Sequence, residues 1–392
     1  MSDAVIVAAA RTPIGTARKG TLLDVTTFEL AAHAAGEALK RSGIPAADVD
    51  DMQMGESLQG GGDVARYAAI DLGLIDVPGM ALNRHCASGM GAVQSAAGSI
   101  IAGMDKVAIA GGSESMSSMP MVSKRTPFTD DWAQWMSPSH PEQPDAPAFD
   151  MSITVGLNTA NAAGLTRQDC DEWAVRSHQR AVQAIDEGRF DEEIVPIEVK
   201  LRDGSTKLFA VDEHPRRDSN MEKMASLKPL HPEIADFPIT AGNASGVNDG
   251  AAALILVSSD YAKANGLTPL AKIVSWASTG TNPRDTGLGP ILSIPKALDR
   301  AGMTVADLDL AEINEAFASV PVAACRKLGL SEDITNVSGS GCSLGHPVAC
   351  TGARMIITTM FELRRRGGGI GMASMCAGGG MGSATIFEVY AG

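Results

Sequence analysis

Aromatic side chains are scarce in this chain of 392 residues, in which Phe, Trp and Tyr together make up only 4%. The sequence contains no apolar run near the roughly 18 residues of a membrane-spanning helix. Positive charge is also in deficit, because the formal net charge is −14 at pH 7. These absences argue against a membrane protein and against a surface that binds nucleic acids or anionic lipids.

The apolar run 5–10 is preceded by Asp3 and followed by Arg11. It predicts a first strand rather than a signal peptide. We therefore expect a cytoplasmic protein, in which any strongly anionic ligand has to find a local basic patch.

The cysteines form no C-x-x-C pair, and no histidine stands at metal-binding spacing from them. This argues against a zinc site and against a disulfide framework, and it indicates a reduced compartment with one or more reactive thiols. The six cysteines are Cys86, Cys170, Cys325, Cys342, Cys350 and Cys376.

Glycine is abundant, at 42 of 392 residues, compared with roughly 7% in an average protein. This predicts many tight turns and close backbone approaches. Charged residues at 20% and hydrophobic residues at 44% are typical of a globular protein. The length leaves room for two or three domains.

The first part of the chain alternates strands and helices, which is typical of a layered α/β domain. We expect strands at 4–9, 52–57 and 80–82, helices at 27–42, 63–72 and 87–102, and a buried strand at 107–110 that Gly111 and Gly112 close.

From about residue 113 to 238 the alternation is lost, and only 169–187 predicts a clear helix. An inserted region of this length is usually functional, as a lid or binding surface. It contains a group of basic residues, which could be a binding patch for an anionic ligand or an ordinary solvated face. The group consists of Arg216, Arg217, Lys223 and Lys228.

The second half repeats the first in kind. We expect strands at 251–257, 269–276, 308–313, 371–375 and 385–389, and helices at 291–301, 315–328 and 349–366. In the first half, the loop at Cys86 is followed by a helix, a strand and Gly111-Gly112. In the second half, the loop at His346 is followed in the same order by a helix, a strand and the glycines 378–380. The pattern therefore indicates a duplicated unit.

Cys86 is the candidate nucleophile, because it stands where a strand gives way to a helix of small residues. A helix start favours thiolate over thiol. The alternative is an inert buried cysteine. His85 is expected to point to the opposite face and not to serve as the base for Cys86.

Three further loops carry the residue types that acyl transfer requires, at 314–317, 345–347 and 376–382. In a doubly wound sheet the carboxyl ends of the strands lie on one side, where ligands bind. The four loops are therefore expected to meet. Taken singly, Asn314 is also typical of a helix cap, His346 of a turn and Cys376 of a buried strand.

With these motifs in order, the sequence resembles the thiolase family of acyl-CoA acyltransferases over essentially its whole length. The motifs are Asn83-Arg84-x-Cys86, Gly111 to Ser117, Thr240 to Gly246 with Asn248 to Ala251, Asn314 to Phe317, Gly345 to Pro347 with Thr351 to Arg354, and Cys376 with its glycines.

The resemblance implies catalytic roles for five residues. Cys86 would carry the acyl group and His346 would take its proton. Cys376 would exchange a proton with the α-carbon of the acetyl unit. Asn314 would hold a water that stabilises the enolate oxygen together with His346, and the backbone N–H groups of Cys86 and Gly378 would form the other oxyanion site.

The resemblance also implies coenzyme A as a substrate, with no tightly bound cofactor and no metal. Arg216 would meet its phosphates or adenine and Ser245 its pantetheine arm. Met151, Ala241 and Phe317 would line the acyl end. Cys342 and Cys350 are expected to be packing residues.

The expected fold is a duplicated, layered α-β-α-β-α fold with a long inserted loop region. We expect an N-terminal domain of 1–118 and 239–268, an inserted domain of 119–238 and a C-terminal domain of 269–392. The assembly is expected to be a homodimer, or a homotetramer.

The predicted function is cleavage of a 3-ketoacyl-CoA by CoA to acetyl-CoA and a shortened acyl-CoA. Three alternatives stay open: condensation of two acetyl-CoA, a non-catalytic acyl-binding or scaffold subunit, and a redox sensor. Asp150 stands where acetoacetyl-specific relatives commonly carry histidine, Ser338 where asparagine is common, and 119–149 does not resemble the usual tetramer-forming loop.

Overall fold

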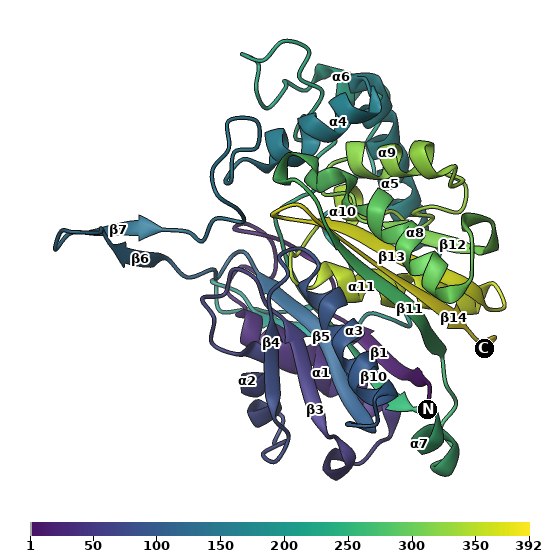
Figure 1. Ribbon diagram of the computed structural model, residues 1–392. Coiled ribbons are helices and arrows are strands. Elements are labelled where there is room, and N and C mark those ends of the chain that lie inside the picture. Colours follow the sequence, from purple (N-terminus) through teal and green to yellow (C-terminus); the bar gives the residue numbers. More distant parts are fainter. Residues whose placement is uncertain (1) are drawn as a thin grey trace.

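The two halves of the chain form the same arrangement of four strands in the computed structural model, which describes residues 2–392 (Figure 1). In the first half the order is β3-β5-β10-β1, and in the second it is β12-β13-β14-β11. In each, the first pair is parallel and the other two are antiparallel. The strands are β1 (Ala4–Arg11), β3 (Asp51–Gly55), β5 (Val107–Ser115), β10 (Asn248–Ser258), β11 (Ala271–Gly280), β12 (Leu310–Ile313), β13 (Gly369–Ala377) and β14 (Met381–Val389).

The halves join edge to edge through a short antiparallel contact between β1 and β11, in which Val5 faces Lys272 and Ile6 faces Ala271. β4 (Gly79–Leu82) extends the first half as an edge strand parallel to β3, and β2 (Gly15–Thr16) pairs with β10. The described residues thus form one mixed sheet of ten strands. The expectation of a doubly wound sheet is wrong in this respect, because six of the nine pairs of neighbouring strands run antiparallel.

Helices cover the sheet in layers, as the predicted α-β-α-β-α fold requires. α1 (Thr27–Ser42) and α2 (Val64–Asp71) cover the outer face of the first half, and α8 (Gly289–Ala301) and α9 (Ser319–Leu328) that of the second. α3 (Ser88–Ile101) and α11 (Thr351–Arg365) pack against each other between the halves. The fold class is confirmed.

The sequence explains where α1 begins and ends. The Thr26 hydroxyl and the Glu29 carboxylate form a reciprocal capping box at its start, and Gly43, at φ 67°, ends it in the left-handed conformation. Its alanines and Leu30 face the core, which confirms the predicted helix over 27–42.

The middle layer depends on small residues. A Cβ on Gly89 of α3 would lie 2.5 Å from the carbonyl oxygen of Ala349, and one on Gly112 of β5 would lie 2.0 Å from the same oxygen. Around this contact, Met90, Val93 and Ile356 are fully buried in a shared core. Only glycine allows the two backbones to approach so closely.

The same contact corrects one expectation. Gly111 and Gly112 do not close the strand, because β5 continues to Ser115 and pairs with β10 along that whole length. These glycines allow close packing and do not form a turn. The local sequence cannot distinguish the two roles.

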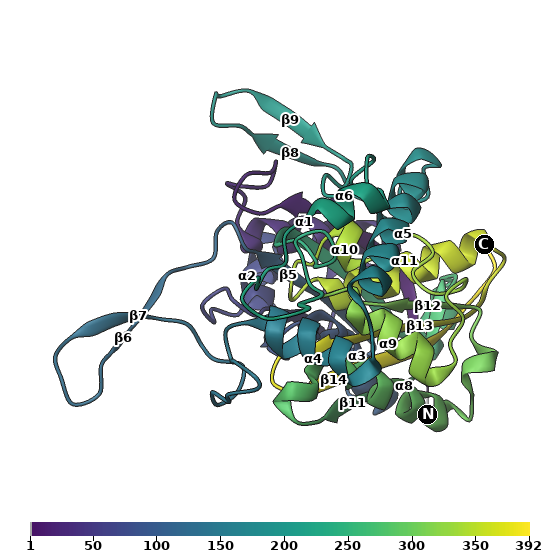
Figure 2. The same ribbon diagram turned by 90° about the horizontal axis from the view of Figure 1, so that it is seen from above.

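The inserted region has more regular structure than predicted. Besides α5 (Arg167–Asp186), it forms a π-helix, two hairpins and two short helices. These are η2 (Ser152–Leu157), β6 (Val122–Arg125) with β7 (Trp132–Trp135), β8 (Ile197–Lys200) with β9 (Thr206–Phe209), α4 (Asn158–Ala163) and α6 (Met221–Ser226). The β6–β7 hairpin projects from the body, as both views show (Figures 1 and 2), with Phe128 and Trp132 exposed.

The remaining elements are α7 (Ser259–Ala264), α10 (Gly341–Leu344), η1 (Ala46–Asp48), η3 (Pro283–Leu288) and η4 (Val305–Asp307). None of the helices formed by residues 2–392 has the length and apolarity that a membrane crossing needs.

Replacing Gly112 with alanine should lower the free energy of unfolding by about 3 kcal/mol, because the new methyl group overlaps backbone atoms that cannot rotate away. Urea denaturation of the two proteins measures the difference. Gly62→Ala is the control, since nothing lies within 4 Å of that position, and it should change stability by less than about 0.5 kcal/mol. Equal effects at both sites would contradict the close-approach argument.

Candidate active site

Seven of the ten predicted site residues line one cavity of about 260 Å³ between the two halves and the inserted region. They come from six separate segments of the chain. The seven are Cys86, Met151, Ser245, Phe317, His346, Cys376 and Gly378. Sequence reasoning therefore brought together residues that the fold also brings together.

Cys86 lies in a tight turn between β4 and α3, directly before the N-terminal cap residue of the helix. The Ser88 hydroxyl donates to the carbonyl of His85 at 2.6 Å and accepts the backbone N–H of Arg84 at 2.9 Å. The Asn83 side chain accepts the N–H of His85 at 2.9 Å. These bonds fix the loop on both sides of Cys86.

His85 corrects a second expectation. Its φ is 47°, so the residue is left-handed and the alternation of a strand does not apply to it. Its side chain lines the same cavity as Cys86. Burial, and next the neighbouring His140, lower its pKa from the usual value.

The thiol of Cys86 is protonated in the resting protein. Burial raises its pKa to about 11, against a backbone N–H hydrogen bond from Gly378 that lowers it, and the carboxylate of Glu114 raises it further. The expectation that the helix start stabilises the thiolate is wrong for the resting site, because burial outweighs the local donors. To act as a nucleophile, Cys86 would therefore need a base.

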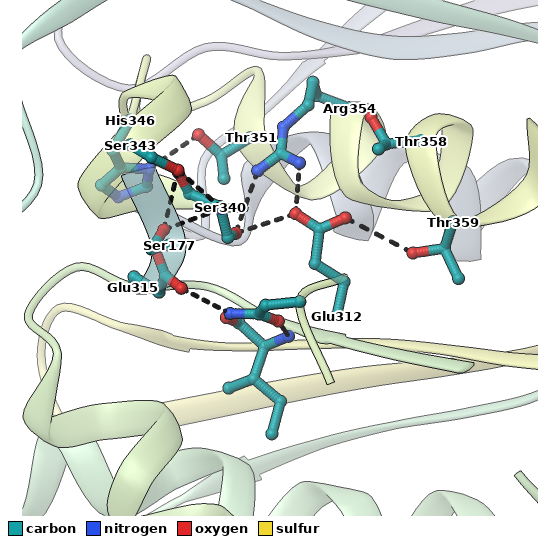
Figure 3. Close-up of polar contacts among 12 residues, drawn as sticks. Ser177, Glu312, Glu315, Ser340, Ser343, His346, Thr351, Arg354, Thr358 and Thr359 are labelled. Atoms are coloured by element: carbon teal, nitrogen blue, oxygen red, sulfur yellow. Dashed lines mark hydrogen bonds and ion pairs between the residues drawn. The ribbon is translucent and has the colours of Figure 1, made fainter. Parts of the chain in front are cut away.

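His346 is one of the two histidines that line the cavity, with His85. It is 6% exposed and sits in the turn between α10 and α11. Its backbone N–H donates to the side-chain oxygen of Asn248 at 3.0 Å, and its Nδ1 lies 2.7 Å from the hydroxyl of Thr351 (Figure 3). Burial, and next the charge of Arg354, lower the His346 pKa to about 3, so the ring is neutral at pH 7.

Asn314 follows β12 and is fully buried behind His346. Its Nδ2 lies 3.5 Å from the histidine Nε2, and its Oδ1 is buried without a partner among the described residues. The helix-cap alternative is wrong, since α9 has Ala318 as its cap residue. A buried amide with a free acceptor beside the base is suited to hold a water or a substrate hydrogen-bonding group.

Cys376 is the second thiol, one residue before the end of β13. Burial, and next the neighbouring Cys86, raise its pKa above the usual value. Gly379 and Gly380 follow in the left-handed region, at φ 83° and 78°. The backbone of Gly378, just before this turn, lowers the pKa of the Cys86 thiol.

The opposite wall of the cavity is apolar and comes from the inserted region. Met136, Phe149 and Val155 extend the surface that Met151 and Phe317 form. Val155 belongs to the π-helix η2, an irregularity that often occurs at functional sites.

Two predicted contacts lie elsewhere. Arg216 and Ala241 are exposed and are not among the residues that line this cavity. Within the basic group of the inserted region, Arg217 pairs with Asp186 at 2.6 Å and Lys223 pairs with Asp218.

Glu114 is a buried site residue to which sequence reasoning gave no role. Its carboxylate accepts the N–H of Leu58 at 3.0 Å, the amide of Gln59 at 2.5 Å and the N–H of Ala349 at 3.1 Å. It thereby ties the cavity wall at Leu58 to the loop that carries His346. Glu114 is the one acidic residue in a run of small residues at a strand end, and this pattern could have identified it as a site residue.

Cys342 and Cys350 are both buried, at 1% exposure each, and burial raises the pKa of each thiol. Neither lines the cavity. Among residues 2–392, no cluster of three or more His, Cys, Asp or Glu side chains is arranged to hold a metal ion.

The cavity combines a half-buried thiol, a neutral imidazole, a second, buried thiol and backbone donors at the junction of two similar α/β halves. These are the groups of an enzyme that transfers an acyl group through a cysteine. The thiolase N-terminal domain matches residues 4–260 and the thiolase C-terminal domain matches residues 267–389. The chain therefore belongs to the thiolase family of acyltransferases.

Relatives of two kinds are similar over nearly the full length. An acetyl-CoA acetyltransferase of Syntrophomonas wolfei is 41% identical over 98% of this chain and 99% of that protein. A 3-ketoacyl-CoA thiolase of Bacillus subtilis is 39% identical over 99% and 100%. The crystal structure of human mitochondrial 3-ketoacyl-CoA thiolase in complex with CoA superimposes with a TM-score of 0.90, at 36% identity, over 100% of this chain and 98% of that one.

The alkylation of Cys86 by iodoacetamide should keep accelerating as the pH rises past 8. With a pKa of about 11 the thiolate fraction is small at pH 7 and grows tenfold per pH unit until the pH approaches that value. Mass spectrometry of the Cys86 peptide, at pH 5 to 10, measures the rate.

A preformed thiolate–imidazolium pair would instead give a rate that is level from below pH 7. That profile would overturn the neutral-pair description. Cys376→Ser is the control, because it removes the other thiol of the cavity and should leave the Cys86 profile unchanged in shape.

Proposed function

We propose that the protein cleaves a 3-ketoacyl-CoA with free CoA, giving acetyl-CoA and an acyl-CoA shortened by two carbons. The observation that carries this proposal is the second thiol, Cys376, next to Cys86 in one cavity. A simple acyl transfer needs one nucleophile and one base, whereas breaking a carbon–carbon bond also needs a proton donor at carbon.

In the first half-reaction, Nε2 of His346 takes the proton of Cys86 while the sulfur bonds to C3 of the substrate. The C2–C3 bond then breaks, and its electron pair stays on C2 as the enolate of acetyl-CoA. Cys376 donates its proton to C2, and acetyl-CoA leaves. The backbone N–H groups of Cys86 and Gly378 donate hydrogen bonds to the oxygen on C3. Asn314, through a water, and His346 stabilise the enolate oxygen.

In the second half-reaction, the thiolate of Cys376 takes the proton of the CoA thiol. The CoA sulfur attacks the acyl carbon, the bond to Cys86 breaks, and the acyl group leaves as a new thioester. Cys86 then recovers its proton from His346. Each proton removed is returned, so the site ends as it began.

The apolar wall supports a substrate with an acyl part longer than acetyl, because Met136, Phe149, Met151, Val155 and Phe317 form a surface that an acetyl group alone cannot cover. Condensation of two acetyl-CoA is the second candidate. Relatives named acetyl-CoA acetyltransferase favour it, and it is the same set of steps in reverse. A non-catalytic subunit is disfavoured by the convergence of both thiols and the histidine.

CoA is the proposed second substrate, with Ser245 at the cavity for the pantetheine arm and Arg216 outside it for the phosphates. Arg217 and Lys223 are held by Asp186 and Asp218, whereas Arg216 is exposed and in no ion pair among the described residues. Ser245 lies at the cavity and Arg216 at the surface, so a long ligand such as CoA could contact both.

A homodimer is the proposed assembly. β4 is an edge of the sheet, and around it Tyr67, Ile70, Ile75 and Met80 are each at least 41% exposed. An open strand edge with apolar neighbours is a surface that proteins cover. The assembly stays a prediction.

Mixing the protein with acetyl-CoA should add one acetyl group to the Cys86 peptide, detected by mass spectrometry, and Cys86→Ala should abolish it. Cys376→Ser should keep this acetylation and lose cleavage of a 3-ketoacyl-CoA by at least about 10²-fold, because the variant lacks the acid at C2. Acetylation of another residue, or cleavage by Cys376→Ser at the wild-type rate, would refute the assignments.

Arg216→Ala should raise KM for CoA roughly threefold to tenfold and leave kcat nearly unchanged, because a phosphate contact remote from the cavity acts on binding. Arg217→Ala is the matched control, since its charge is already paired with Asp186, and it should change KM less. Equal effects would show that Arg216 has no special contact with CoA.

A further inference from the structure

Thr351 is the first residue of α11 and lies directly behind the catalytic histidine (Figure 3). It is fully buried and is not among the residues that line the cavity. Its hydroxyl lies 2.7 Å from Nδ1 of His346 and 2.9 Å from the carbonyl oxygen of Pro347. The single hydroxyl proton can serve only one of these two neighbours.

The carbonyl of Pro347 can only accept, so the 2.9 Å contact is a hydrogen bond only if Thr351 donates to it. The same carbonyl also accepts the backbone N–H groups of Cys350 and Thr351, at 3.0 Å each. Without the hydroxyl proton, two oxygen lone pairs would face each other at that distance. The proton is therefore committed to Pro347, and Nδ1 of His346 has to be the donor in the 2.7 Å contact.

The other ring nitrogen, Nε2, lies 3.5 Å from Nδ2 of Asn314, at the outer limit of a hydrogen bond. The contact with Thr351 is therefore the short one at the ring, and it selects the tautomer with the proton on Nδ1 and a lone pair on Nε2.

We propose that Thr351 is a positioning residue that holds His346 in the tautomer with a free Nε2, which is the nitrogen that receives the proton of Cys86. The inference deepens the proposed function and rests on it for the identity of the proton donor. Thr351 acts through His346 and contacts no substrate.

The tautomer matters here because both members of the pair are neutral before reaction. Burial and Arg354 keep the His346 ring uncharged, and burial keeps Cys86 a thiol. With the proton on Nε2, that nitrogen would have no lone pair to accept the proton of Cys86. Asn248 holds the histidine backbone but touches neither ring nitrogen, so the hydroxyl of Thr351 is the contact that discriminates.

The test compares Thr351→Val, which keeps the shape and removes the hydroxyl, with Thr351→Ser, which restores it. Acylation of Cys86 by acetyl-CoA, followed by rapid quench at pH 7, should slow by roughly 10²-fold in the valine variant, since an inverted tautomer at a catalytic histidine costs up to about 10⁴-fold. The serine variant should recover most of the rate. The KM for acetyl-CoA should stay within about twofold in both, because Thr351 does not line the cavity.

Thr358→Val is the matched control. Thr358 lies two turns further along α11, is also buried, and donates to Glu193 at 3.0 Å away from the cavity. It should lose stability to a similar degree and keep its acylation rate. If both valine variants slow acylation equally, the effect is general destabilisation and the role of Thr351 is refuted.

Nitrogen NMR of histidine-labelled protein without substrate tests the tautomer directly, whether or not the valine variant folds. The His346 signals, assigned with His346→Asn, should show a protonated Nδ1 and an unprotonated Nε2 at pH 7. The reverse assignment in the wild type overturns the proposal. Wild-type protein that shows this tautomer yet takes no acetyl group would instead count against the proposed function alone.

Discussion

The contact between the backbones of the two middle helices is the constraint on which the site depends. Gly89 at the start of α3 and Gly112 on β5 leave room for the carbonyl of Ala349, which lies just before α11. Cys86 precedes α3 by two residues and His346 precedes α11 by five, so this approach brings thiol and imidazole into one cavity. A side chain at either glycine would separate the halves and thereby the two groups.

Burial sets the electrostatics of the cavity and supplies the reason for a base. It raises the pKa of both thiols and lowers that of His346, so the resting groups are uncharged. Charge then forms only during the reaction, where the Gly378 N–H favours the thiolate of Cys86. A fixed donor in a dry cavity is worth more than the same donor in water, because it need not reorganise.

The sequence predicted the repeated strand–helix pattern and the convergence of Cys86, His346 and Cys376, because small-residue helices, glycine turns and reactive side chains are local signals. It misjudged features that depend on distant partners. The continuation of β5 through Gly112 follows from Ala349, and the left-handed turn at His85 follows from Ser88 and Asn83. The raised pKa of Cys86 likewise reflects burial by the whole fold. The secondary structure of the inserted region was the hardest to predict, since its short elements are stabilised by contacts with the rest of the protein.

Glu315 shows how that region is attached to the site. Its buried carboxylate accepts hydrogen bonds from Trp173 at 2.8 Å and Ser177 at 2.6 Å, both on α5, and from the N–H of Cys342 on α10 at 3.0 Å (Figure 3 draws Ser177). α10 leads directly into the His346 turn. Burial raises the pKa of this carboxyl group and its hydrogen-bond donors lower it, so losing one donor would leave a buried polar atom unsatisfied. α5 of the inserted region and the short helix that leads to His346 are therefore held by one side chain.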